Sequence, residues 1–70
     1  MTEVKANMAG NVWKIVVEEG ETVTEGQDTA ILESMKMEIH NSTTTDGTVK
    51  EFKVSEGDFI NEGDVIAIIE

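Results

Sequence analysis

The segment Gly10–Glu33, with the sequence GNVWKIVVEEGETVTEGQDTAILE, is followed 37 positions later by a related segment, Gly47–Glu70, with the sequence GTVKEFKVSEGDFINEGDVIAIIE. The two segments align without an insertion. Identical residues recur at this offset: Gly10 and Gly47, Val12 and Val49, Val17 and Val54, Glu19-Gly20 and Glu56-Gly57, Glu25-Gly26 and Glu62-Gly63, Ala30-Ile31 and Ala67-Ile68, and Glu33 and Glu70. Two copies are too few for a solenoid, which needs at least three repeats. They predict a single domain over residues 1–70 with approximate two-fold symmetry.

Each copy has the pattern of short β-strands separated by glycine turns. In the first copy Trp13, Ile15 and Val17 alternate with Lys14 and Val16, and this period of two is typical of a half-buried strand. Turns are expected at the glycines, which adopt positive φ freely: Gly10, Gly20, Gly26, Gly47, Gly57 and Gly63. Apolar residues nowhere recur at helical spacing. The sequence therefore predicts an all-β domain in which two small sheets of about four strands each pack face to face.

The link between the two copies contains the sequence Met35-Lys36-Met37. The first copy ends at Glu33, so a tight hairpin directly after it would expose Lys36 to water. The equivalent link of the second copy would lie beyond Glu70. The two ends of the chain are therefore expected at the opposite, symmetry-related end of the domain.

The composition limits the partners that the protein can have. Fifteen acidic residues against five basic ones give a formal net charge of −10. Because phosphate groups and anionic lipids are repelled by such a charge, neither nucleic acid nor a membrane surface is an expected partner. The acidity favours solubility, or alternatively steers the protein toward partners with basic surfaces. The chain contains no cysteine, and its N-terminal residues lack the pattern of a signal peptide, so a cytoplasmic location is expected.

The side chains that carry most enzyme chemistry are scarce. His40 is the only histidine, and no residues around it have the spacing of metal ligands, so it is expected to be an ordinary strand or turn residue. Trp13 is expected to pack in the core, because aromatic residues dominate small cores. The acidic residues at the turns are expected to be solvated. No catalytic residues and no metal site are predicted, and the protein is expected not to be an enzyme.

Short motifs are spread along nearly the whole chain. Residues 33–39 read Glu-Ser-Met-Lys-Met-Glu-Ile, residues 6–12 read Ala-x-Met-x-Gly-x-Val, and Asp-Gly-x-Val begins at residue 46. Residues 19–26 and 56–63 each begin with Glu-Gly-acid and end in glycine. Together these motifs resemble the biotinyl-lipoyl attachment domain family, whose biotin branch is marked by Met-Lys-Met. The chain looks most like the small stand-alone biotin/lipoyl attachment proteins of bacteria.

The resemblance implies a flattened β-barrel of two four-stranded antiparallel sheets, the barrel-sandwich hybrid, with the lysine at a hairpin tip. It implies that a biotin-protein ligase acylates Lys36 with biotin, and that Met35 and Met37 are flanking recognition residues. Ser34, Glu33 and Glu38 would form the surroundings of the hairpin. A free lysine amine is mostly protonated at neutral pH. Activation must therefore come from the ligase.

The function implied by the resemblance is that of a monomeric biotin carrier. It would shuttle a carboxyl group between the biotin carboxylase and carboxyltransferase components of a biotin-dependent carboxylase. Two alternatives remain: a lipoyl or dual acceptor, modified by lipoyl-attaching enzymes and serving 2-oxo-acid dehydrogenases, and an unmodified structural module. Ser34 stands where the biotin branch usually has alanine, which leaves the choice between biotin and lipoate open. Because no insertion interrupts the first copy, the thumb loop of some carriers is expected to be absent.

Overall fold

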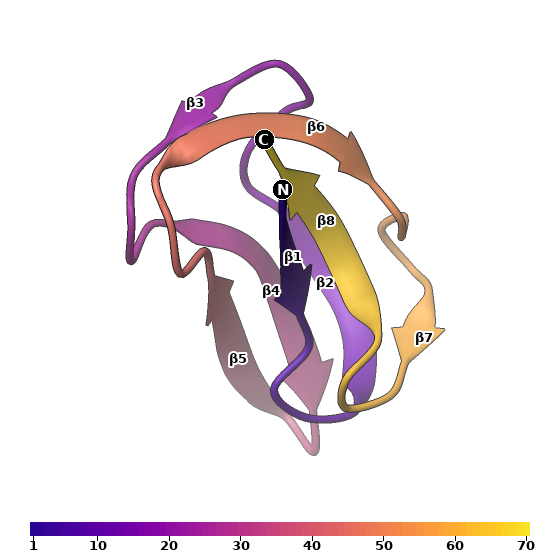
Figure 1. Cartoon of the computed structure of the whole chain (residues 1–70). Coiled ribbons are helices and arrows are strands. Elements are labelled where there is room, and N and C mark those ends of the chain that lie inside the picture. Colours follow the sequence, from indigo (N-terminus) through magenta and orange to yellow (C-terminus); the bar gives the residue numbers. More distant parts are fainter.

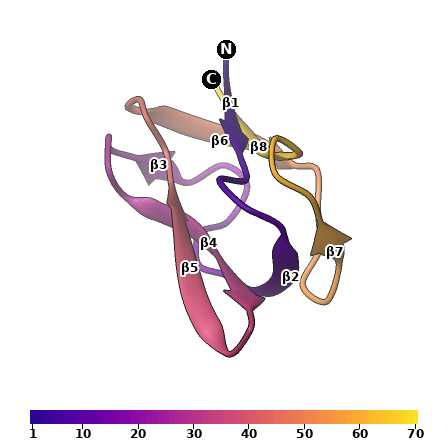
Figure 2. The ribbon, with the colours of Figure 1, turned by 90° about the horizontal axis from the view of Figure 1, so that it is seen from below.

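The structure, a computed structural model, describes all 70 residues and consists of eight β-strands joined by turns and loops (Figure 1). The strands are β1 (Thr2–Lys5), β2 (Gly10–Ile15), β3 (Thr22–Val23), β4 (Asp28–Ser34), β5 (Met37–Ser42), β6 (Gly47–Phe52), β7 (Phe59–Ile60) and β8 (Val65–Ile69). They form two four-stranded antiparallel sheets in two layers (Figure 2). One sheet, with the order β1-β8-β6-β3, holds both chain ends and is called the terminal sheet. The other, with the order β5-β4-β2-β7, contains the β4–β5 hairpin and is called the hairpin sheet. The predicted fold class is confirmed.

The two sheets are related by the offset of 37 residues. Replacing β1–β4 by β5–β8 converts the strand order of one sheet into that of the other. Hydrogen bonds follow the same rule: the N–H of Val12 donates to the carbonyl of Asp58 at 2.7 Å, and the N–H of Val49 donates to the carbonyl of Glu21 at 2.9 Å. The equivalence also includes β1 and β5, although their sequences do not match. Backbone pairing can repeat without sequence similarity because its donors and acceptors are common to all residues except proline.

Apolar side chains from both sheets form one core. Its buried members are Val4, Ala6, Val12, Val17, Val23, Ala30, Leu32, Val49, Ile60, Ile66, Ala67 and Ile69. Most of them alternate along their strands with exposed residues, as expected when each sheet has one face toward the core and the other toward solvent. This packing makes the hairpin sheet a firm support for the loops at its ends.

Trp13 lies outside the core, and the expectation that it would pack there is wrong. Its side chain is 52 % exposed. The cause is a β-bulge: Val12 pairs with Leu32 and Lys14 pairs with Ile31, so β2 has one residue more than β4 across this interval. An extra residue changes which side chains face the core. As a result Val12 is buried and Trp13 points to solvent.

Four turns in the structure share one hydrogen-bond arrangement. At the first, the N–H of Glu21 donates to the carbonyl of Glu18 at 3.0 Å, and Gly20 has a φ of 89°. This is the geometry of a type II turn, which favours glycine at that position. The Glu21 carboxylate also accepts a hydrogen bond from the N–H of Glu18 at 3.1 Å. The turns at Gly26, Gly57 and Gly63 repeat both bonds, so the residue after each glycine stabilises its turn directly instead of being merely solvated.

Gly10 and Gly47 differ from the other glycines, because they begin strands β2 and β6 and do not lie in turns. The prediction of a turn at these two positions is therefore corrected. A Cβ atom at Gly47 would lie 2.6 Å from the carbonyl oxygen of Glu70, and one at Gly10 would lie 2.9 Å from that of Glu33. Both residues are glycine because the backbone of β4, or of the residue directly after β8, passes too close for any side chain.

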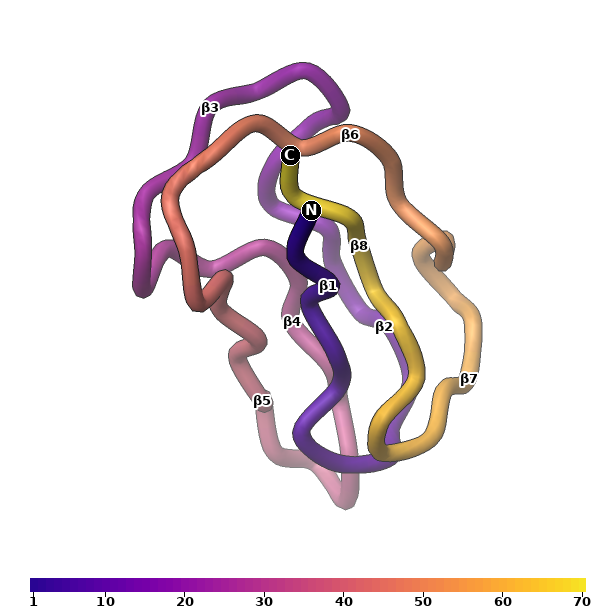
Figure 3. Tube along the Cα trace, viewed as in Figure 1, coloured from indigo at the N-terminus to yellow at the C-terminus, as the bar shows by residue number.

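The β4–β5 hairpin and the chain ends lie at opposite ends of the molecule (Figures 1 and 3). Thr2 pairs with Ile69, so the two ends are side by side in the terminal sheet. This agrees with the expected placement. No helix in the structure is long or apolar enough to span a membrane.

Candidate functional site

The tip of the β4–β5 hairpin consists of Met35 and Lys36. Ser34 and Met37 form the last pair of the ladder, so the loop has only two residues. Both have positive φ values, 52° for Met35 and 66° for Lys36. Positive φ at both central residues is typical of a type I′ turn, which usually contains Asn-Gly or Gly-Gly. The hairpin thus places a methionine and a lysine where the backbone conformation strongly favours other residues.

The side chains at the tip extend into solvent. The exposed fraction is 92 % for Met35 and 65 % for Met37, so packing at the core edge does not account for these methionines. Lys36 is also exposed, and its amine makes no hydrogen bond or ion pair within the chain. The hairpin therefore presents a free amine between two adaptable thioether side chains, which suit surfaces that meet more than one partner.

The tip is surrounded by negative charge. Glu33 and Glu38 lie directly opposite each other across the hairpin, and both are exposed. Like charges in directly opposite positions are unfavourable in a sheet. The hairpin thus retains an acidic pair that its own stability does not require.

The base of the hairpin is held closely by β2. Asn11 pairs with Glu33, and a Cβ atom at Gly10 would contact both the Glu33 carbonyl and the Ser34 side chain. Of the predicted site residues, the structure brings together Glu33, Ser34 and Glu38 at this base and the three residues from Met35 to Met37 at the tip.

A second polar cluster, which the sequence analysis did not identify, lies farther along the same hairpin. His40 Nδ1 lies 2.8 Å from Asp28 Oδ2, and the Ser42 hydroxyl donates to Asp28 Oδ1 at 3.0 Å. The hydrogen bond from His40, followed by that from Ser42, holds the pKa of the Asp28 carboxyl below its ordinary value of 3.8. Residue spacing along the chain carries no sign of this cluster, because only the register of β4 and β5 brings the three side chains together.

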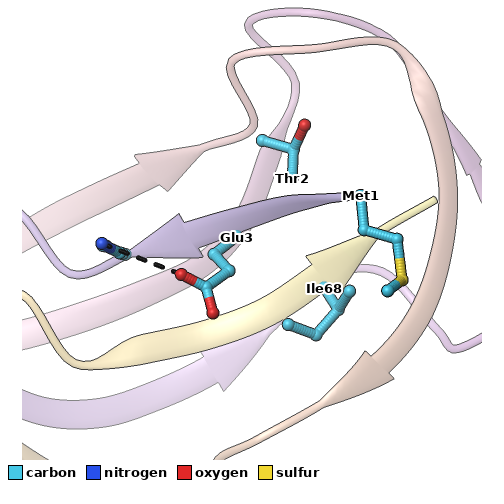
Figure 4. A pocket seen from close by; sticks show the side chains of 5 residues that line it. Met1, Thr2, Glu3 and Ile68 are labelled. Atoms are coloured by element: carbon cyan, nitrogen blue, oxygen red, sulfur yellow. Dashed lines mark ion pairs between the residues drawn. The ribbon is translucent and has the colours of Figure 1, made fainter.

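One shallow pocket is present, at the other end of the molecule. Met1, Thr2, Glu3, Lys5 and Ile68 line it, and Figure 4 shows the ion pair between Lys5 and Glu3 at its edge. The pocket belongs to the outer side of β1 and β8 and has no contact with the Lys36 hairpin. No group of three or more His, Cys, Asp or Glu side chains is arranged to hold a metal ion.

Comparison with known proteins agrees with this arrangement. The family described as "Biotin-requiring enzyme" matches residues 2–69. The chain is 56 % identical over 63 residues to the Biotin/lipoyl attachment protein of Bacillus subtilis, with 90 % of this chain and 86 % of that protein covered. It is 42 % identical over 64 residues to the Biotin carboxyl carrier protein of Streptococcus mutans, which covers 91 % of this chain and 49 % of that protein.

A solved structure has the same fold. The urea carboxylase of Kluyveromyces lactis contains a region that superposes on this chain with a TM-score of 0.93 at 30 % sequence identity. The match covers 99 % of this chain and 6 % of the carboxylase. The whole fold described above therefore recurs as one small part of a much larger protein.

Proposed function

Because this chain belongs to the biotin/lipoyl attachment domain family, we propose that Lys36 is its acceptor lysine and that the group attached there is biotin. The protein is a carrier domain and not an enzyme. The observation that carries the proposal is the two-residue turn with positive φ at Met35 and Lys36. Residues kept in a disfavoured conformation at an exposed tip point to a functional requirement at that tip.

Attachment of biotin forms an amide between the Lys36 Nζ atom and the biotin carboxyl carbon. The ligase supplies biotin as its adenylate, so AMP leaves as the amine attacks and the amine loses a proton. The carrier contributes access and orientation: the Lys36 amine has no partner in the chain, and the rigid hairpin presents it away from the sheet. Met35 and Met37 supply the apolar surface on which the ligase recognises the tip.

The modified lysine then carries a carboxyl group between a biotin carboxylase and a carboxyltransferase. The long flexible arm lets one biotin reach two active sites, so a high local concentration replaces free diffusion. The similarity to the Streptococcus mutans carrier and to part of the Kluyveromyces lactis urea carboxylase supports this assignment. The proposed location of this carboxyl transfer is the cytoplasm.

Lipoate is the second candidate group. Ser34 pairs with Met37 at the end of the hairpin, at the position where alanine is usual in the biotin branch. Its hydroxyl adds a hydrogen-bonding group directly beside the turn, where a modifying enzyme must fit. The similarity to the Bacillus subtilis Biotin/lipoyl attachment protein supports keeping lipoate as an alternative.

Intact-mass spectrometry of the protein purified from its native cell, followed by fragmentation, tests the proposal. We expect a biotin adduct on Lys36 that is abolished in Lys36→Arg. The control is Lys53→Arg, since Lys53 is an exposed lysine directly after β6, outside the β4–β5 hairpin, and its substitution should leave the adduct intact. Lipoate on Lys36 would support the second candidate, whereas an adduct that persists in Lys36→Arg would show that the acceptor is another residue.

A further inference from the structure

The outer surface of the hairpin sheet carries large apolar side chains. The exposed fraction is 52 % for Trp13, 63 % for Phe59 and 40 % for Val16. Phe59 pairs with Asn11, and Trp13 lies two residues from Asn11 along the same strand. Diagonal neighbours of this kind lie about 7–8 Å apart, within reach of aromatic side chains. Trp13, Val16 and Phe59 are called the aromatic patch.

The terminal sheet has polar residues at the positions equivalent to those of the aromatic patch. At the offset of 37 residues, Trp13 corresponds to Lys50, Val16 to Lys53 and Phe59 to Thr22, and all three of these are also exposed. The backbone is equivalent as well, because β6 has a bulge between Val49 and Glu51 at the same place as the bulge in β2.

Comparing the two sheets shows whether the fold requires apolar residues at the positions of the aromatic patch. Single exposed apolar residues are ordinary on protein surfaces. Here, however, three occur on one face, while their equivalents on the other face are two lysines and a threonine. Since the fold accepts polar residues at these positions, the aromatic patch is not required for folding. Exposed apolar surface that folding does not require indicates contact with another molecule.

Acidic side chains border the aromatic patch on the side of Phe59, and one exposed basic residue, Lys14, directly follows Trp13 in β2. Asp58 directly precedes Phe59, and Glu56 is held beside β2, because its Oε2 atom accepts a hydrogen bond from the N–H of Ile15 at 2.9 Å. A second copy of this chain would bring the same acidic side chains to this border and a further net charge of −10 to the complex, which disfavours self-association through this face. Charge complementarity instead favours a partner whose apolar cleft is bordered by lysine and arginine.

The position of Trp13 in the aromatic patch distinguishes a partner that attaches a group to Lys36 from one that uses the group afterwards. Along β2, Asn11 is level with Glu33 near the hairpin tip, and Trp13 lies farther from the tip, next to Leu32 and Ile31. The distance from Trp13 to the tip is roughly 15 Å, at about 3.3 Å per strand residue. A partner held there leaves Lys36 and its cargo free to move. An enzyme that attaches the group must instead grip the tip itself.

We propose that the aromatic patch is the docking surface for the biotin carboxylase that uses the group on Lys36, through an apolar cleft on that enzyme bordered by basic residues. Trp13 is the expected anchor, because tryptophan is among the residues most enriched at the energetic centre of interfaces. This inference rests on the proposed function.

The variant that tests the proposal is Trp13→Lys with Phe59→Thr, which gives the hairpin sheet the residue types of the terminal sheet at these two positions. Both substitutions insert the residue found at the equivalent exposed position, so folding should be retained. The matched control is Lys50→Ala with Thr22→Ala. Each protein is biotinylated, checked by intact mass, and used as substrate for the purified biotin carboxylase of the source organism with ATP and bicarbonate.

We expect the KM for the biotinylated patch variant to rise at least tenfold with kcat nearly unchanged, while the control matches the parent. An unchanged KM for fully biotinylated patch variant would overturn the docking proposal. So would a defect confined to the biotinylation step, because it would assign the patch to the ligase. Failure of the proposed function is distinguishable, since the parent protein from its native cell would then carry no biotin on Lys36.

Trp13 provides an independent measurement, because it is the only tryptophan and the chain has no tyrosine. Titration of the biotinylated carrier with the carboxylase should shift the Trp13 emission to shorter wavelength as the indole leaves water. The affinity should also fall as NaCl is raised, because the border of the patch is charged. An emission maximum that stays in place at saturating carboxylase would contradict the proposal.

Discussion

Met35 and Lys36 hold the hairpin tip in a conformation that costs free energy. A residue other than glycine in the left-handed region is destabilised by roughly 1–2 kcal/mol, and both tip residues have φ values in that region. The six paired positions between β4 and β5 offset this cost and keep the loop at two residues. The strained turn holds Lys36 at a defined position. This position favours attachment of a group to Lys36 and does not contribute to folding.

Lys36→Gly should therefore stabilise the protein while abolishing its modification. Relief of the left-handed strain exceeds the entropy cost of glycine by about 0.5–1 kcal/mol, which corresponds to a rise in Tm of roughly 2–8 °C for a domain of this size. Thermal unfolding followed by circular dichroism measures it. Lys50→Gly is the control: Lys50 lies in a strand without positive φ, so the same change should lower Tm. A lower Tm for Lys36→Gly would show that the turn is not strained.

At the scale of the elements, two glutamates connect the sheets in a reciprocal way. Glu19 follows β2 and its Oε2 accepts the N–H of Phe52 in β6 at 3.0 Å. Glu56 follows β6 and its Oε2 accepts the N–H of Ile15 in β2 at 2.9 Å. Each carboxylate bonds to a strand of the opposite sheet near a place where the strand leaves its ladder. The repeated Glu-Gly motif thus has two roles, one in the turn and one between the sheets.

Because the two glutamates are equivalent, Glu19→Ala and Glu56→Ala should destabilise the protein equally. Each removes one hydrogen bond between a charged carboxylate and a partly exposed N–H, at a cost of about 0.5–1.5 kcal/mol. Urea denaturation gives the free energy of unfolding for each variant. Glu25→Ala is the control, since the Glu25 carboxylate is exposed and makes no hydrogen bond. Unequal losses that differ by more than about 0.5 kcal/mol would contradict the equivalence.

At the scale of the whole molecule, a large net negative charge is confined to a small folded body. The net charge of −10 is spread over a body whose longest extent is 31 Å. The Debye length is about 30 Å at 0.01 M salt and about 10 Å at 0.1 M salt. At low salt, therefore, nearly all the acidic residues repel one another across the molecule, and this repulsion destabilises the compact state.

Raising NaCl from roughly 0.01 M to 0.1 M should consequently increase Tm by a few degrees, because the Debye length then becomes shorter than the molecule and the repulsion between distant acidic residues is screened. Differential scanning calorimetry measures the change. Glu25→Gln with Glu62→Gln removes two exposed charges and should reduce the salt effect. A Tm that is independent of NaCl in the parent would show that self-repulsion is unimportant. Salt is thus expected to act in opposite directions on two properties: it should raise the Tm of the protein and lower the affinity of the aromatic patch for the carboxylase.

The repeat made much of this structure predictable. The matching glycine turns and the alternating apolar residues indicated two four-stranded sheets, and the break between the copies indicated an exposed Lys36. The aromatic patch could also have been inferred from the repeat, since Lys50 stands at the position equivalent to Trp13 and lysine seldom lies in a core. The alternation around Trp13 suggested the reverse because periodicity alone does not show where a bulge falls.

Local pattern and the internal repeat determined the all-β fold class, the turns at Gly20, Gly26, Gly57 and Gly63 and the hairpin that presents Lys36, because these depend on backbone preference and on burial averaged over neighbouring residues. Only the tertiary structure decided that Gly10 and Gly47 are passed closely by a distant part of the chain, and that Glu19 and Glu56 bond across the sheets. Each of these features is set by a strand register, or by a contact between residues far apart in the chain, and neither is encoded in any single stretch of sequence.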